Sequence, residues 1–291
     1  MRLQDVLAPA LLAATLTAAG PARADLEHSR DTLHESIWLH WRTRVLPWTL
    51  QAGSAVGLSP MDGPVITPDD VLSAMEVATE TWSEPSCTDL AFVYAGWVTD
   101  RSTSMTTGKD QADHVNKIVI RNQDWSDSAC ETGDTIACTT VVYRRGAGEL
   151  LDADIDLNDR DFDFALDPST SPGAIDLVSV LTHETGHFVG FDHSDWEESV
   201  MYPQLHPGEL RRSLAADELG TLCETYPAGE CTVANDLGQY DCAPAWQPAS
   251  CACRAAPGAG RPDGGAALLL LAAAGCLFAH RKRAGRRSGR L

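Results

Sequence analysis

The stretch HETGHFVGFDH, residues 183–193, places three histidines and one glutamate at fixed spacing. Residues four apart on an α-helix differ by only about 40° of rotation, so His183 and His187 project from one face and can share a metal ion. Gly190 allows a positive-φ turn out of the helix, which brings His193 back as a third ligand. The string therefore predicts a helix with two ligands, followed by a loop with the third.

Three neutral imidazoles leave the fourth position of a tetrahedral zinc site open, which is the layout of a catalytic zinc rather than a structural one. Glu184 follows the first ligand directly, so its carboxylate can reach a water there, take its proton and pass it to a leaving amine. We expect one zinc, Glu184 as general base and no residues for an organic cofactor. The alternative is a helix that carries surface histidines and binds no metal. That alternative does not explain why a strongly apolar helix has His and Glu at the spacing of metal ligands.

Patterns around this string predict an α/β fold. Thr67 is suited to cap a helix that begins at Pro68, with Asp70 at its third position and apolar side chains as far as Trp82. A third helix is expected over 213–226, with Leu214, Leu219, Leu222 and Tyr226 inward. The second helix is expected over 174–190, and strands over 38–51, 90–98, 114–122, 139–145 and 149–159.

The last of these strands alternates acidic with apolar residues. Asp152, Asp154 and Asp156 fall on one face, which predicts a strand half exposed to solvent. The acidic run continues to Asp163 and could hold calcium, yet it lacks the glycine and terminal glutamate of an EF-hand loop. A solvated acidic loop is favoured over a calcium site.

Both ends of the chain have the pattern of targeting segments. Residues 1–24 hold an apolar run that ends in Ala22-Arg23-Ala24, as in a cleaved secretory signal. Residues 264–291 hold a second apolar run with a basic end. Its apolar part, 264–279, spans about 24 Å, short of a bilayer core of about 30 Å. We expect export across an inner membrane, followed by secretion or attachment at the cell envelope.

Between these ends we expect a short N-terminal segment at 25–40, one catalytic domain at 41–227 and a stalk rich in Cys, Pro and Gly at 228–263. Residues 25–250 carry 12 basic and 39 acidic side chains, a formal charge of −27. This charge repels nucleic acid and mildly favours neutral or basic substrates, although a surface kept soluble by charge explains it equally well.

Eight of the nine cysteines lie between Cys87 and Cys253, in a chain expected to meet an oxidising compartment. Disulfides are the default expectation there. Cys130 and Cys138 are close enough to close one loop. The pairing among the next four stays open: Cys87, Cys223, Cys231 and Cys242.

The histidine string fits HExxHxxGxxH and so resembles the metzincin signature, and SVMYP at 199–203 resembles the Met-turn that follows it. Ser194 after the third ligand, and LAADELGTLCETY at 214–226 with Asp217, resemble the matrixins, which are similar to matrix metalloproteinases. The resemblance covers about 41–227. It implies that Met201 forms an apolar floor beneath the histidines, and that DADIDLN at 152–158 is the edge strand that pairs with extended substrate.

Several features depart from this family. No cysteine between Asp25 and Ser86 could block the zinc, so no cysteine switch is expected. A second, structural zinc would need more histidines than His114 alone. The tail resembles a myxobacterial-type C-terminal sorting signal, with Cys251 and Cys253 as the marking cysteines; a fourth disulfide or a simple membrane anchor is the alternative.

Together these features predict a metzincin-like α/β fold: a twisted, mixed, mostly parallel sheet on two long helices, with a small C-terminal part that carries the Met-turn and the third helix. The expected function is that of an exported zinc metalloendopeptidase. It would act as a monomer on protein or peptide substrates, attached to the envelope through its tail. The alternative is an inactive zinc-binding adhesion or recognition module on the same fold.

Overall fold

The computed structural model describes residues 26–51, 65–103, 112–128, 130 and 134–242, all within one compact unit that spans residues 1–245. The predicted leader 1–24, the cysteines Cys251 and Cys253 and the apolar run 264–279 lie outside these described residues. Within the described ranges, every helix is too short or too polar to cross a bilayer.

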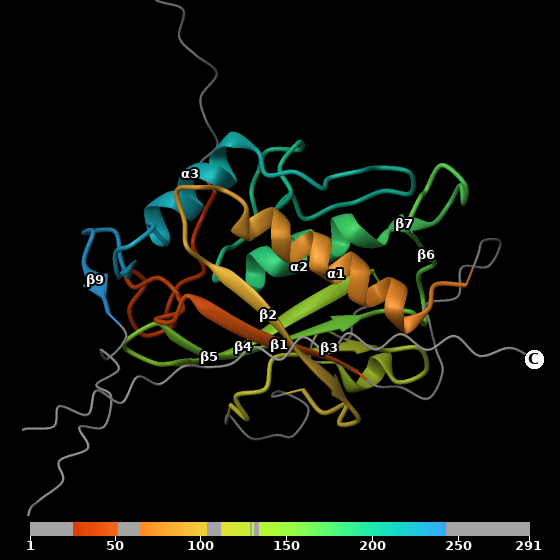
Figure 1. Ribbon diagram of the computed structural model, residues 1–291, viewed down its shortest axis with the longest axis horizontal. Helices are drawn as coiled ribbons and strands as arrows, with labels where there is room; N and C mark the ends of the chain where they lie inside the picture. Colours follow the sequence, from red (N-terminus) through yellow and green to blue (C-terminus); the bar gives the residue numbers. More distant parts are fainter. Residues whose placement is uncertain (1–25, 52–64, 104–111, 129, 131–133, 243–291) are drawn as a thin grey trace, which may run out of the picture. The chain divides into compact units, whose positions relative to one another are not determined.

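Five strands form the main sheet, in the order β2-β1-β3-β5-β4 (Figure 1). The first four are parallel, and β4 runs antiparallel to β5 at one edge. The prediction of a mixed, mostly parallel sheet is confirmed. The strands are β1 (Val45–Gln51), β2 (Ala91–Val98), β3 (Lys117–Ile120), β4 (Ala137–Arg144) and β5 (Glu149–Leu157).

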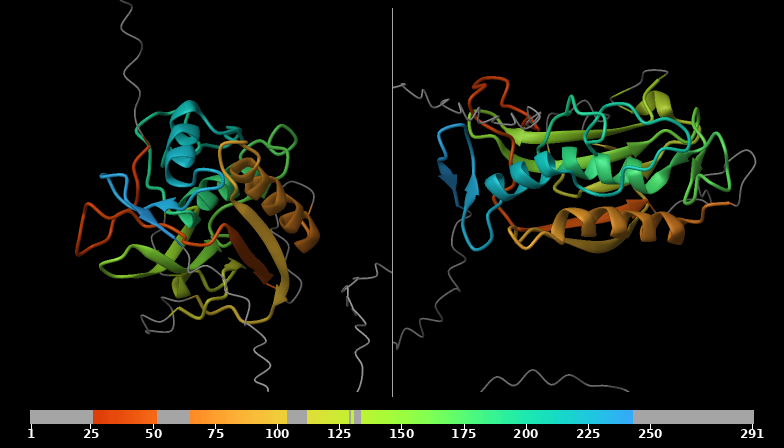
Figure 2. Two further views of the ribbon diagram at one scale, coloured as in Figure 1. Left: turned by 60° about the vertical axis from the view of Figure 1, so that its left-hand side comes forward. Right: turned by 90° about the horizontal axis from the view of Figure 1, so that it is seen from above.

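Two helices cover one face of this sheet and lie side by side (Figures 1 and 2). Helix α1 (Pro68–Ser83) begins as predicted, because Thr67 and Asp70 cap each other's backbone N–H groups. Helix α2 (Leu177–Phe188) carries the first two histidines of the string. The indole N–H of Trp82 in α1 donates to the Thr182 carbonyl in α2 at 2.8 Å, within a fully buried interface.

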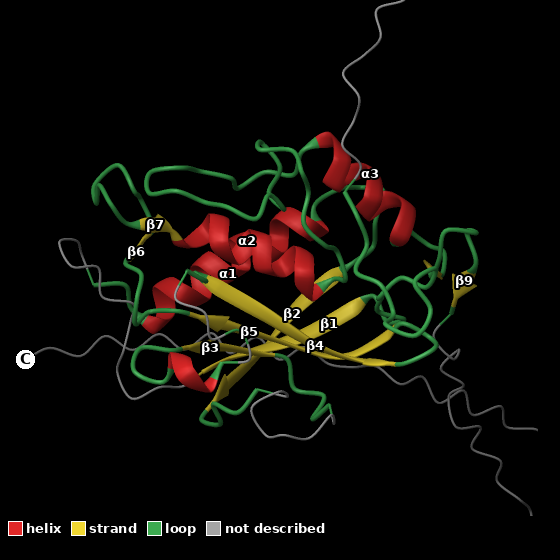
Figure 3. Ribbon diagram, turned by 180° about the vertical axis from the view of Figure 1, so that it is seen from behind, coloured by secondary structure: helices red, strands yellow, loops and turns green. Residues whose placement is uncertain are grey.

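The remaining elements are short. Helix α3 (Ala216–Thr225) follows the site residues, with Leu222 and Tyr226 fully buried as predicted, whereas Leu219 is 40% exposed and so does not point inward. Figure 3 shows α3 apart from the α1–α2 pair. The other elements are η1 (Trp125–Asp127), β6 (Phe164–Ala165), β7 (Ile175–Asp176), β8 (Thr232–Val233) and β9 (Tyr240–Asp241).

The predicted first strand is shorter than expected. Only Val45–Gln51 pairs in the sheet, whereas Trp38 and His40 make isolated bridges. The aromatic residues that suggested a strand are buried for another reason: the Trp41 indole N–H donates to the Phe188 carbonyl at the end of α2, at 2.7 Å. The aromatic residues of segment 38–44 therefore indicate packing against the end of helix α2 and not a strand.

Strand β5 corrects two expectations. It lies between β3 and β4, so β4 and not DADIDLN is the edge strand. Its acidic face is also buried: Asp152, Asp154 and Asp156 are each at most 1% exposed, not in contact with solvent. Described residues between β2 and β4 cover this face, since the Asp113 N–H donates to Asp152 at 3.1 Å and the Arg121 side chain meets Asp156.

A buried ion pair and backbone hydrogen bonds stabilise these carboxylates. The Arg121 side chain, 2% exposed, donates from Nε to Asp156 at 2.9 Å and from a terminal nitrogen to Asp124 at 3.1 Å. Burial raises the pKa of Asp156, and the charge of Arg121 opposes that rise. The backbone N–H of Lys117 donates to Asp154 at 2.9 Å. The alternating acidic pattern thus marks carboxylates that are buried and held by an ion pair and hydrogen bonds, and not a face exposed to solvent.

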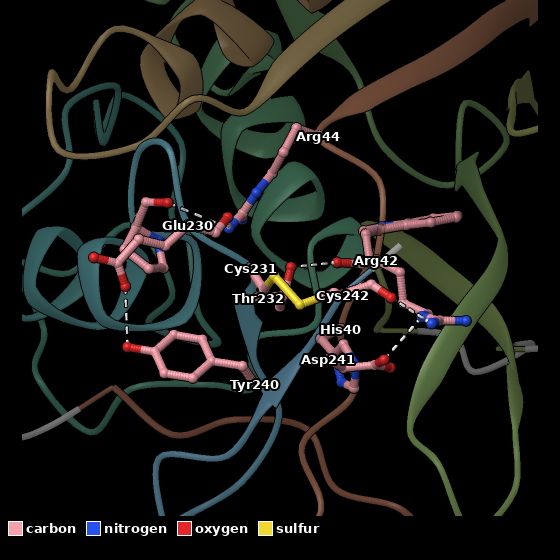
Figure 4. The surroundings of a disulfide bond; sticks show 11 residues. His40, Arg42, Arg44, Glu230, Cys231, Thr232, Tyr240, Asp241 and Cys242 are labelled. Atoms are coloured by element: carbon pink, nitrogen blue, oxygen red, sulfur yellow. Dashed lines mark hydrogen bonds and ion pairs between the residues drawn. A yellow bond between two sulfur atoms is a disulfide. The ribbon is translucent and has the colours of Figure 1, made fainter. Parts of the chain in front are cut away.

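Three disulfides join the described cysteines. Cys130–Cys138 closes the predicted loop, and the open pairing resolves to Cys87–Cys223 and Cys231–Cys242. The last one closes the β8–β9 hairpin, and Arg42 and His40 of the N-terminal segment both meet Asp241 of this hairpin (Figure 4). Residues 232–241, expected to lie in a stalk, therefore pack on the folded unit.

The buried ion pair gives a testable prediction about stability. Arg121→Ala leaves Asp156 buried without its partner, which is expected to lower the free energy of unfolding by about 3–5 kcal/mol. Arg144→Ala removes an exposed partner of Glu149 and should cost less than about 1 kcal/mol. Urea unfolding of the two variants measures both values. Equal losses would show that the buried pair contributes no more than a surface pair.

Candidate metal centre

The structure brings the three histidines of the string together. One ring nitrogen from each of His183, His187 and His193 lies within 4.8 Å of the others, and the Nε2 atoms of His187 and His193 are 3.2 Å apart. The first two come from consecutive turns of α2 and the third from the loop after it. Three converging imidazole nitrogens are a donor set that suits zinc.

Backbone carbonyls fix the orientation of two rings. The Nδ1–H of His183 donates to the Val200 carbonyl and that of His187 to the Phe191 carbonyl, both at 2.8 Å. A carbonyl oxygen can only accept, so Nδ1 carries the proton in both rings and Nε2 keeps its lone pair. Each Nε2 is therefore in the form that binds a metal.

The helix ends where the sequence predicts. Gly190 has a φ of 95°, its N–H donates to the His187 carbonyl, and the Phe191 N–H donates to the Gly186 carbonyl. These two bonds form a Schellman motif, which turns the chain sharply. Glycine is required for a second reason as well: a Cβ here would lie 2.2 Å from the Leu39 carbonyl oxygen.

The N-terminal segment holds the loop that carries the third ligand. Sequence patterns did not predict this support. The Ser29 N–H donates to the Gly190 carbonyl, and the Asp192 N–H donates to the Glu27 carbonyl, both at 2.9 Å. His28, which sequence reasoning left without a role, stacks on Trp38 with ring centroids 3.6 Å apart. The loop that carries His193 is thus held by residues about 160 positions earlier in the chain.

Met201, predicted to form an apolar floor beneath the histidines, packs against helix α2. Its side chain is fully buried, and a Cβ on Gly186 would lie 2.2 Å from its sulfur atom, so the thioether sits against the turn of α2 between the two histidines. The Met201 carbonyl accepts from the Ser194 N–H at 2.9 Å, and the Ser194 hydroxyl donates to Asp217 at 3.1 Å. Gly186 is a residue whose role only the packing reveals.

Glu184 is buried beside the histidines, at 4% exposure. Its Oε2 accepts a hydrogen bond of 2.6 Å from the Thr139 hydroxyl on β4. Burial raises the pKa of the Glu184 carboxyl to about 7, and the bond from Thr139 opposes the rise. A carboxyl with a pKa near neutrality can both accept and release a proton at physiological pH.

Burial has the opposite effect on the histidines. It lowers the pKa of His187 to about 4 and that of His183 well below 6.5, and it also lowers the pKa of His193. All three rings are therefore neutral at pH 7, which is the protonation state of a metal ligand.

Comparison with known proteins agrees with this geometry. Residues 59–226 match the matrixin family, Peptidase_M10. The chain belongs to the matrixin family. It is 42% identical over 57 residues to metalloendoproteinase 1-MMP of Arabidopsis thaliana, which is 20% of this chain and 16% of that protein. It is 38% identical over 64 residues to metalloendoproteinase 1 of Glycine max, 22% of this chain and 20% of that protein. The chain thus matches only about a fifth or less of the length of these relatives.

This matrixin has a cleft of about 440 Å³ that is lined by the three histidines and Glu184. Its lining includes Ala137 to Val141 of the edge strand β4, Tyr202 of the Met-turn, and Leu205 and Arg211 beyond that turn. His206 is exposed and does not line the cleft, and His114 lies outside the histidine group, bonded to the Leu151 carbonyl. The expected cleft beside the small C-terminal part is therefore present.

The lowered histidine pKa values give a prediction for zinc retention against pH. A base with a lowered pKa stays neutral until the pH approaches that value, so protons should compete with zinc only as the pH falls towards about 4, the pKa of His187. Zinc content after dialysis over a pH series measures this, with circular dichroism as a control for folding. Half-loss near pH 6.5 in folded protein would contradict it.

The turn at Gly190 gives a second prediction. Gly190→Ala adds a clash with Leu39 to the strain of a positive φ, so we expect a loss of more than about 2 kcal/mol and reduced zinc content. Gly208→Ala has a similar φ of 85° but open space around its Cβ, and should cost only about 1–2 kcal/mol without loss of zinc. Thermal unfolding and zinc analysis of both variants separate the strain of a positive φ from the clash with Leu39. Equal losses of stability and zinc in the two variants would show that the clash with Leu39 has no effect.

Proposed function

We propose that this matrixin is a zinc-dependent endopeptidase with Glu184 as general base. The observation that carries the proposal is the position of the Glu184 carboxylate, in the same cleft as three histidines that present neutral Nε2 atoms. A site that only binds zinc needs the three nitrogens but no buried carboxyl beside them. The relatives named metalloendoproteinases support the same activity.

In this mechanism His183, His187 and His193 would hold a zinc ion, which supplies a Lewis acid that polarises the scissile carbonyl and lowers the pKa of water. Glu184 takes the proton of the attacking water and returns it to the leaving amine. Its pKa of about 7 suits both transfers. The cleft walls orient the peptide and limit the access of other water.

Strand β4 is suited to bind the substrate backbone. Among the described residues it pairs only with β5, so its other edge is free to add an extended peptide as a further strand. The cleft follows this edge, so a bound peptide would pass over Glu184 and the histidines. The excess of acidic residues favours neutral or basic substrates.

We further propose that the enzyme is exported and works as a monomer at the envelope. Residues 1–24 would be the leader, 41–227 the catalytic domain, and the tail from 264, with Cys251 and Cys253 before it, the sorting or anchoring segment. The three disulfides support an oxidising compartment.

Glu184→Gln tests the proposed activity. The amide keeps the shape of the side chain but cannot take a proton, so we expect casein or gelatin hydrolysis to fall at least about 100-fold while bound zinc stays unchanged. His187→Ala is the companion variant and should lose zinc as well as activity. Hydrolysis that persists in Glu184→Gln, or a wild type that binds zinc and cleaves nothing, would reject the mechanism.

A further inference from the structure

We propose that Thr139 is a positioning residue for the general base, whose hydroxyl holds the Glu184 carboxylate in the orientation that catalysis needs. The inference rests on the proposed peptidase function and extends it to a side chain on strand β4, which lines the cleft. Neither the histidine string nor the Met-turn contains this residue.

The contact is short and directional. Thr139 Oγ1 lies 2.6 Å from Glu184 Oε2 and 3.1 Å from the Glu184 backbone oxygen. A hydroxyl has one proton, so the shorter contact to the carboxylate takes it. The backbone N–H of Thr139 also faces this carboxylate, and that group is kept in any variant of the side chain. The Thr139 hydroxyl thus holds Oε2 of a flexible side chain in place.

The scaffold around Thr139 is rigid. Strand β4 pairs with β5, where Thr139 lies opposite Ile155, and the neighbouring Cys138 is joined to Cys130. Side chains alternate along a strand, so Thr139 faces α2 whereas Thr140 faces the other side of the sheet. Thr139 is half-buried and Thr140 is buried, and the Thr140 hydroxyl has no hydrogen-bond partner among the described residues. The same strand therefore offers a matched residue that does not touch Glu184.

The position of Thr139 joins two functions of the cleft. Its backbone belongs to the edge strand proposed to pair with substrate, and its side chain holds the base. Removal of the hydroxyl should then leave substrate binding intact, because the strand backbone is unchanged, and should slow the chemical step. A residue that only stabilised the fold would not produce this division.

Kinetics of the full chain with a fluorogenic peptide test the proposal. Thr139→Val keeps the β-branched shape but removes the donor, and we expect kcat to fall about 10–100-fold, with KM within about twofold of wild type and zinc content unchanged. Thr139→Ser restores the hydroxyl and should recover most of kcat. Thr140→Val, the matched control, should behave as wild type.

Binding of a peptide hydroxamate, measured by calorimetry, adds a readout that does not depend on turnover. The hydroxamate oxygen would meet the Glu184 carboxylate, so its affinity should fall in Thr139→Val and stay unchanged in Thr140→Val. A wild-type kcat or hydroxamate affinity in Thr139→Val would overturn the proposal. So would loss of zinc or of folding in both Thr139→Val and Thr139→Ala, because the residue would then hold the fold and not the base.

Failure of the proposed function gives a different result. A wild-type chain that binds zinc but cleaves no peptide would reject the peptidase, while the hydroxamate affinities would still decide whether Thr139 orients Glu184. Conversely, an active wild type with an inactive Glu184→Gln and a fully active Thr139→Val would reject only the role of Thr139.

Discussion

Helix α2 ends at Gly190, where the backbone takes a φ of 95° and passes so close to Leu39 that no side chain fits between them. Two ligands precede this turn and the third follows it. If the helix continued, His193 would lie on a later turn and could not meet His183 and His187. The convergence of the three nitrogens, and with it the cleft beside them, depends on this one sharp exit from the helix.

The fold supports that exit from both sides. Residues 27–29 pair with the loop that carries His193, and the Met-turn bonds to Ser194 just beyond it. Met201 fits under the histidines because Gly186 leaves room for its sulfur atom. The sheet is stabilised differently on its two faces: the helix side is apolar, whereas the opposite side buries Asp156 against Arg121. The metal centre therefore rests on a sheet that is covered on both faces.

Burial also sets the chemistry of the site. It lowers the pKa of the histidines, which keeps them neutral, and raises the pKa of Glu184 to about 7, which suits a group that takes and returns a proton. Both shifts have the same cause, since a low-dielectric environment disfavours either charge. Burial in one cleft thus keeps the histidines neutral for metal binding and gives Glu184 a pKa suited to proton transfer.

The sequence by itself determined the features that depend on local spacing. These are the two ligands on one helix face, the Gly190 turn, the Thr67 cap of α1 and the loop closed by Cys130 and Cys138; each follows from backbone periodicity or short-range geometry. The mixed sheet was expected from the resemblance to the metzincins and not from local spacing. Only the tertiary structure decided which strand lies at the edge, that Asp152, Asp154 and Asp156 are buried, and that Thr139 bonds Glu184. Alternation along a strand shows which side chains share a face, but not what covers that face, because the cover comes from segments distant in the chain.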